Sequence, residues 1–124
     1  IGLVPDSGST WFLPRLVGLG KALEMTYTAE PVDAAEAYRI GLVNRVVPHD
    51  DLIPETMALA ARLAAGPTKG YGLTKRAINY ALGASLEQAL EYEAQLQDVA
   101  GATADHREGV AAFLEKRQPK YEGR

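Results

Sequence analysis

One segment limits more than any other what this chain can fold into. Residues 42–48, LVNRVVP, are rich in β-branched side chains and stop at a proline, which is typical of a β-strand. A lone strand leaves its backbone N–H and C=O groups unpaired, because a β-ladder needs a neighbouring strand. The pattern predicts one or two short strands at most, with partners that lie elsewhere.

The remaining patterned sequence is helical. Apolar periodicity predicts helices in seven stretches: 8–18, 21–28, 34–41, 50–66, 67–83, 85–101 and 105–117. Asp33 has the side chain and position of a helix cap, and Gly41 those of a helix end. Pro14 falls within the first stretch, where it is tolerated only in a first turn or at a kink. The chain is therefore expected to be mainly α-helical.

Composition excludes several classes of function. The chain has 124 residues, a net charge of -3 and no cysteine. Its Lys and Arg residues are scattered, so we expect no nucleic-acid partner. Without cysteine there is no disulfide, thiolate zinc site or cysteine nucleophile, which agrees with a cytoplasmic protein. No apolar run approaches the roughly 18 residues of a membrane span. The pattern predicts a soluble protein that does not bind membranes.

Asp6 is the first candidate site residue. An aspartate before Ser-Gly and an apolar run favours a helix N-cap or a turn. Alternatively, a carboxylate at a helix mouth, among Leu3, Val4, Trp11 and Phe12, could be a partly desolvated base that moves a proton. Local evidence favours the structural interpretation.

The other candidate groups carry weaker signals. His49 and His106 lack the i, i+4 partner of a helical metal site, so we predict surface histidines and no metal. Ser7 and Ser9 lack the setting of a serine nucleophile.

Two cations end the last helical stretch. Lys116 and Arg117 lie where positive charge favours the C-terminal pole of a helix dipole. The competing interpretation is that they hold phosphate groups of a ligand. The sequence alone leaves both open.

Three segments together carry a resemblance. IGLVPDSGSTWFLPRLVG, AAEAYRIGLVNRVVP and DHREGVAAFLEKRQPKY match, in order and spacing, the C-terminal half of the enoyl-CoA hydratase/isomerase (crotonase) superfamily. Within it, GLVPDSG resembles the isomerases that act on ring-1,2-epoxyphenylacetyl-CoA in phenylacetate degradation.

The resemblance implies an activity and its residues. It implies an acyl-CoA isomerase in which Asp6 is the acid/base group, Trp11 and Lys116 contact the substrate, and no cofactor is needed besides the coenzyme A of the thioester. Lys116 matches a family lysine near the adenine and phosphate end of CoA. The chain departs from the family pattern at Ser9, where a second glycine is usual.

The resemblance also implies an α/β crotonase (ClpP/crotonase-like) fold, of which this chain is the helical C-terminal half. Residues 1–50 would end the core spiral domain and carry the active-site helix. Residues 51–124 would form a trimerisation region, with homotrimers or hexamers as the assembly. The oxyanion-hole N–H groups and the two glutamates of hydratases would precede Ile1, so we expect the 124-residue piece alone to be inactive.

Two alternatives stay open. One is an enoyl-CoA hydratase of fatty-acid degradation. The other is an inactive fragment that acts only as an oligomerisation module.

Overall fold

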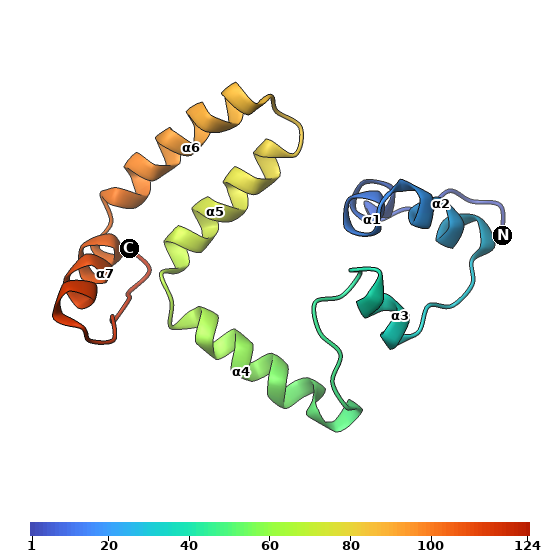
Figure 1. Ribbon diagram of the computed structural model, residues 1–124, viewed down its shortest axis with the longest axis horizontal. Coiled ribbons are helices and arrows are strands. Elements are labelled where there is room, and N and C mark those ends of the chain that lie inside the picture. The colour runs from blue at the N-terminus through green and yellow to red at the C-terminus, as the bar shows by residue number, and fades with distance from the viewer. The chain divides into compact units, whose positions relative to one another are not determined.

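The computed structural model describes all 124 residues, and its regular elements are all helical (Figure 1). Their bounds are α1 Ser9–Val17, α2 Leu19–Thr28, α3 Ala34–Arg39, the 3-10 turn His49–Asp51, α4 Leu52–Ala64, α5 Thr68–Ala81, α6 Leu86–Gly101 and α7 Ala104–Glu115. The predicted helical stretches are confirmed, and each differs from its helix by a few residues at the ends.

The predicted strand at 42–48 is wrong. This segment is irregular, and residues 44–47 share no backbone hydrogen bond with any other part of the chain. The backbone of Leu42 and Val43 instead donates to the carbonyl of Ala37 and closes the end of α3. No second strand exists in the chain, so the β-branched sequence has nothing to pair with.

Contacts divide the chain into two units, Ile1–Leu52 and Ile53–Arg124. In the first unit α1 packs against α2, and the small side chains of Ala22 and Ala37 are its buried apolar residues. Pro14 lies in the interior of α1, where its missing N–H removes one helical hydrogen bond. Asp33 caps α3 as predicted, because its carboxylate accepts the N–H of Glu36 at 2.8 Å.

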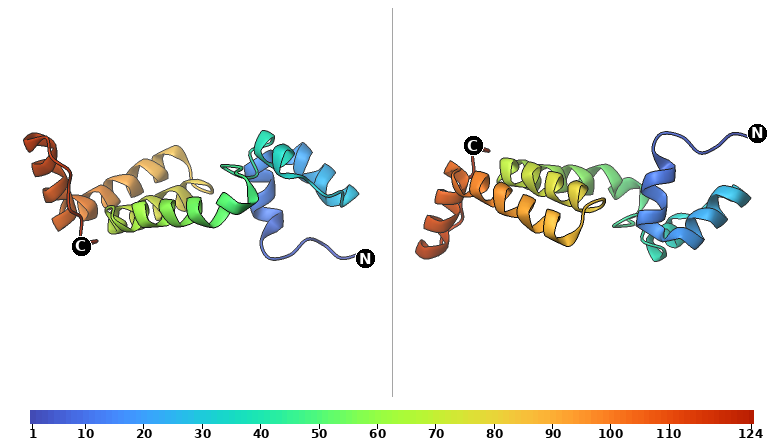
Figure 2. Two further views of the ribbon diagram at one scale, coloured as in Figure 1. Left: turned by 90° about the horizontal axis from the view of Figure 1, so that it is seen from below. Right: turned by 90° about the horizontal axis from the view of Figure 1, so that it is seen from above.

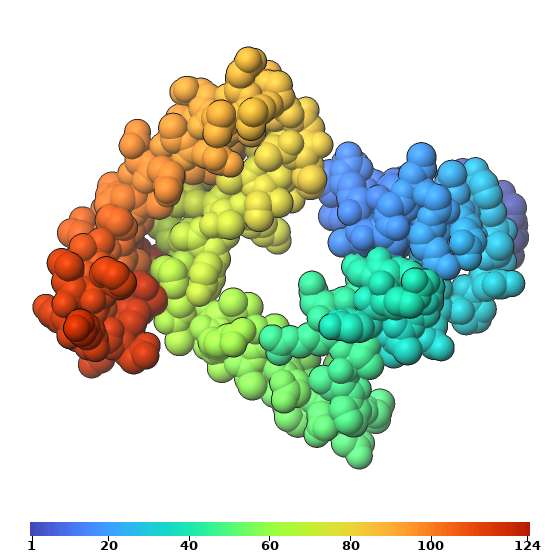
Figure 3. All heavy atoms as spheres, in the orientation of Figure 1, coloured from blue at the N-terminus to red at the C-terminus, as the bar shows by residue number.

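The second unit is built on a helical hairpin. Helices α5 and α6 run side by side in both orientations of the molecule, and their side chains touch along the pair (Figures 2 and 3). Leu73 and Leu96 are buried between them. The turn is closed by a capping box, in which the Ser85 hydroxyl accepts the Gln88 N–H and the Gln88 side chain accepts the Ser85 N–H.

The last helix and the tail fold back on each other. Thr103 caps α7, with its hydroxyl accepting the His106 N–H at 3.0 Å. The tail returns along α7, and the Asp105 N–H donates to the carbonyl of Arg124 at 3.0 Å. The C-terminus accordingly lies beside the start of α7 (Figure 1).

Many large apolar side chains stay exposed in both units. The most exposed on helices include Tyr27, Leu86, Phe113 and Leu114. Exposure on this scale is typical of faces that pack against further protein. None of the helices combines the length and the apolarity that crossing a membrane requires.

Candidate functional site

Asp6 opens the turn that leads into α1. The N–H and hydroxyl of Ser9 both donate to the Asp6 carbonyl, at 2.9 and 2.7 Å. Ser7 and Gly8 have φ angles of 54° and 81°, as in a type I′ turn. The N-cap of α1 is Gly8, and no side chain caps the helix. The turn is confirmed and the Asp6 cap is wrong, because two residues separate Asp6 from the first helical residue.

The carboxylate of Asp6 neither caps a helix nor forms an ion pair. Its Oδ1 accepts one hydrogen bond, 3.1 Å long, from the hydroxyl of the adjacent Ser7, and it forms no salt bridge. The residue is exposed, so its apolar neighbours in the sequence do not enclose it within this chain. Ser9, the departure from the family pattern, fixes the backbone of Asp6 through its hydroxyl.

Two other carboxylates of the first unit, Glu24 and Glu36, are engaged in ion pairs. Glu36 pairs with Arg39 at 2.6 Å and with Lys21 at 3.4 Å. The hydrogen bond from Arg39, and to a smaller extent the one from Lys21, lower the pKa of Glu36 to about 2. Glu24 also pairs with Lys21, at 2.9 Å. The Lys21–Glu36 contact joins α2 to α3, whereas the Asp6 carboxylate forms no ion pair.

Trp11 lies in the first turn of α1. Its ring meets Phe12 edge-on with 4.8 Å between centroids, and the Arg15 guanidinium lies 4.0 Å from the indole centroid. Arg15 also donates to the Trp11 carbonyl at 2.9 Å. This cation–π contact occupies one face of the indole. Any contact with a ligand must therefore use the other face or an edge.

Lys116 and Arg117 have different surroundings at the end of α7. Lys116 adopts the left-handed conformation, with φ 55° and ψ 38°, and its ammonium group has no hydrogen-bond or ion-pair partner in the chain. Its N–H donates to Phe113, and the Arg117 N–H donates to Ala112, which is a Schellman ending. In the sequence, Lys116 and Arg117 had the same two interpretations. In the structure, only Arg117 is paired with carboxylates.

Arg117 is held by two carboxylates. It forms a two-pronged bond to Glu108, at 2.6 and 2.9 Å, and contacts Glu115 at 2.5 Å. The hydrogen bond from Arg117, with a second from the Lys120 N–H, lowers the pKa of Glu108 to about 2. Both partners of Arg117 raise its own pKa. Arg117 is therefore a structural residue of the tail.

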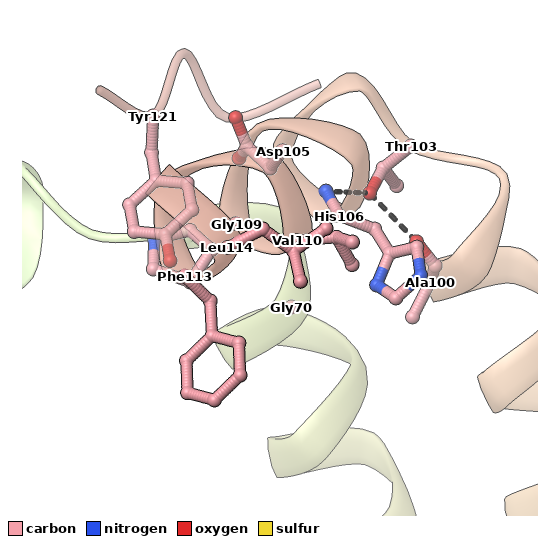
Figure 4. A pocket seen from close by; sticks show the side chains of 11 residues that line it. Gly70, Ala100, Thr103, Asp105, His106, Gly109, Val110, Phe113, Leu114 and Tyr121 are labelled. Carbon is pink, nitrogen blue, oxygen red and sulfur yellow. Dashed lines mark hydrogen bonds between the residues drawn. The ribbon is translucent and has the colours of Figure 1, made fainter. Parts of the chain in front are cut away.

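A pocket of about 430 Å³ lies beside α7 (Figure 4). It is lined by α7, the start of α5, the end of α6 and the tail, with Val110, Phe113 and Tyr121 among its apolar walls. Gly109 makes room for the Tyr121 ring, because a Cβ there would meet the phenol oxygen at 3.3 Å. Phe113 projects away from α7 at the pocket edge.

Sequence reasoning missed Asp105, which forms one wall of this pocket. The residue is 4% exposed, and its carboxylate accepts the N–H groups of Glu122 and Gly123, at 2.7 and 2.9 Å. The only sequence signal was an aspartate in the first turn of a capped helix. Its partners lie 17 and 18 positions away, beyond any helical periodicity.

The structure places the three predicted site residues in different settings. Asp6 and Trp11 belong to the first unit, at the start of α1, and Lys116 belongs to the second unit, at the end of α7. His49 and His106 are exposed, as predicted. No group of three potential metal ligands comes together in the chain.

Comparison with known proteins gives a consistent result. Residues 1–124 match the family described as Enoyl-CoA hydratase/isomerase. A "Probable enoyl-CoA hydratase" of Rhodobacter capsulatus is 47% identical over the whole chain, which covers 48% of that protein. The 1,2-epoxyphenylacetyl-CoA isomerase of Escherichia coli is 41% identical over the whole chain, which covers 47% of it. The chain thus spans about half the length of these relatives.

The fold agrees with these sequences. The crystal structure of an enoyl-CoA hydratase from Bacillus anthracis superposes with a TM-score of 0.93 at 36% identity, over 99% of this chain and 48% of the other. The crotonase fold and the helical C-terminal half are confirmed, and the expected strands are the one correction to the predicted fold. The chain therefore belongs to the enoyl-CoA hydratase/isomerase family.

Proposed function

We propose that the protein is an acyl-CoA isomerase that moves a proton on a CoA thioester with Asp6 as its acid/base group. The favoured substrate is ring-1,2-epoxyphenylacetyl-CoA of phenylacetate degradation. The observation that carries the proposal is the Asp6 turn, in which the backbone is fixed by two bonds from Ser9 and the carboxylate keeps only a hydroxyl neighbour. The similarity to the E. coli isomerase supports the substrate.

Isomerisation of a thioester can be carried out by a single carboxylate that takes up a proton and returns it. A thioester makes the neighbouring C–H acidic by delocalising charge onto its oxygen, and an oxyanion hole stabilises the resulting enolate. A base on a fixed backbone takes the proton at one carbon and returns it at another. Asp6 meets this requirement, because its side chain is neither a helix cap nor an ion-pair partner.

The product distinguishes isomerase from hydratase. The full-length protein would be incubated with ring-1,2-epoxyphenylacetyl-CoA and, separately, with a trans-2-enoyl-CoA, and the products separated from the substrates by liquid chromatography before mass spectrometry. Isomerisation keeps the substrate mass, whereas hydration adds one water. Addition of water to the enoyl-CoA with no conversion of the epoxide would replace the proposal with the hydratase alternative, which the R. capsulatus relative supports.

We also propose that the protein is a cytoplasmic homotrimer or hexamer, assembled through residues 51–124. Exposed apolar side chains on that unit support an assembly role, as with Leu86 and Leu114. Light scattering on the eluted protein measures the mass directly. An oligomer of the full-length protein that turns over neither substrate would favour the oligomerisation module.

A further inference from the structure

The end of α7 places a lysine where glycine is the usual residue. Lys116 has a φ of 55°, a conformation that an L side chain adopts only with strain, whereas glycine adopts it freely. Strain of this kind often marks a site where the side chain has a task. The Schellman hydrogen bonds of this turn are backbone bonds and need no lysine.

Two carboxylates of α7 are bound by Arg117, the residue that follows Lys116. Glu115 precedes Lys116 in the sequence, and Glu108 lies on the same helix. Arg117 engages both, with three contacts of 2.5 to 2.9 Å. A guanidinium binds carboxylates in two-pronged fashion and is less easily displaced than an ammonium group. The ammonium group of Lys116 forms no hydrogen bond or ion pair, while both of these carboxylates are bound to Arg117.

We propose that Arg117 is a positioning residue, which occupies Glu108 and Glu115 and so leaves the Lys116 ammonium free to bind a phosphate group of the CoA substrate. This inference rests on the proposed function, since it takes the phosphate from an acyl-CoA. Arg117 itself makes no contact with the ligand and acts only through Lys116. Without Arg117, one of the two carboxylates captures the ammonium.

The test is a binding cycle on the full-length protein with free coenzyme A as the probe. Isothermal titration calorimetry would measure Kd for the wild type, Lys116→Ala, Arg117→Gln and the double variant. We expect Lys116→Ala and Arg117→Gln each to weaken Kd by about tenfold, the effect of losing one charge-assisted contact. The double variant should bind as Lys116→Ala does, to within about twofold, because Arg117 acts through the lysine.

A rescue variant separates positioning from a loss of folding. Replacing Arg117, Glu108 and Glu115 together by Gln removes the carboxylates that would capture the lysine, so Kd should return to within about threefold of the wild type. Lys116→Gly should raise Tm and still weaken Kd about tenfold, since it relieves strain and removes the ammonium.

Three results would overturn the inference. The first is an unchanged Kd in Arg117→Gln. The second is a double variant in which the two losses of affinity multiply. The third is a triple variant whose Kd does not return towards that of the wild type. A protein that binds coenzyme A in the expected pattern but converts no acyl-CoA would keep this inference and remove the proposed function. A protein that isomerises an acyl-CoA but shows multiplying losses would keep the proposed function and remove this inference. Absence of coenzyme A binding would remove both the inference and the proposed function.

Discussion

The carboxylate of Asp105 accepts the backbone N–H of Gly123 at 2.9 Å, across 18 positions of the chain. A second bond of 2.7 Å from the Glu122 N–H makes the contact two-pronged. The residue is buried, and α7 thereby holds the end of the tail on its own first turn. Gly123 completes the arrangement, because its φ of 77° favours glycine and a Cβ there would meet the Thr68 hydroxyl at 2.5 Å.

Asp105→Asn should destabilise the full-length protein by about 1–3 kcal/mol. Asparagine offers one acceptor oxygen where two N–H groups need one each, so a buried donor loses its partner. Urea unfolding measures the loss, and the Gly123 amide should exchange faster with solvent. Asp98→Asn is the control, because Asp98 is exposed on α6 and its side chain makes no hydrogen bond. Equal stabilities of the two variants would contradict the role of Asp105.

The contact of Glu108 with Arg117 should weaken only in strong acid. The folded-state pKa of Glu108 is about 2, below its ordinary 4.5, so the stabilisation is complete above pH 4.5 and is lost as the pH falls towards 2. An NMR titration that follows the Glu108 carboxyl and the Lys120 amide should show a midpoint near pH 2. In Arg117→Gln the midpoint should move up towards 4.5. A wild-type midpoint near 4.5 would mean that the pair does not form in solution.

Asp6→Asn should lower isomerase turnover of the full-length protein by roughly 100- to 10,000-fold, the usual contribution of a general base. Affinity for the CoA ester should change little, because the amide keeps the size of the side chain. Steady-state kinetics and ligand titration provide the two measurements. Asp50→Asn, which alters another exposed aspartate of the first unit, should turn over as the wild type does. Unchanged turnover in Asp6→Asn would rule out Asp6 as the base.

Ser85→Ala should cost about 1 kcal/mol of stability, the usual effect of losing an N-cap hydroxyl. The hydroxyl accepts the Gln88 N–H, and its removal also opens the capping box between α5 and α6. Ser85→Thr keeps a hydroxyl and should lose much less. The comparison uses chemical denaturation, and an alanine variant as stable as the threonine variant would show that the box contributes nothing.

Sequence signals that span only a few residues were enough to predict the helices. Asp33 caps α3 as the sequence predicted, because a cap is decided within four residues and needs no distant partner. The stretches that end near Gly66, Gly83 and Gly101 became α4, α5 and α6 for the same reason. Apolar periodicity also holds within a single helix, so it could be read without knowledge of the packing.

The predictions from the sequence failed where the structure depends on a distant residue or on an unusual backbone conformation. Residues 42–48 have strand propensity but no partner, and pairing is a property of two segments. Asp6 resembled a cap, but the left-handed Ser7 and Gly8 move the helix start beyond its reach. Asp105 and Arg117 are tied to residues 9 to 18 positions away, which only the folded tail brings close.

The irregular segment between α3 and α4 has a practical consequence for handling the chain. A β-branched stretch with free backbone N–H and C=O groups is a template on which strands of other molecules can add. Val46 is 47% exposed within it, so this segment is where aggregation of the 124-residue piece should begin. A charged gatekeeper such as Val46→Lys should keep the piece monodisperse at concentrations that precipitate the unaltered sequence.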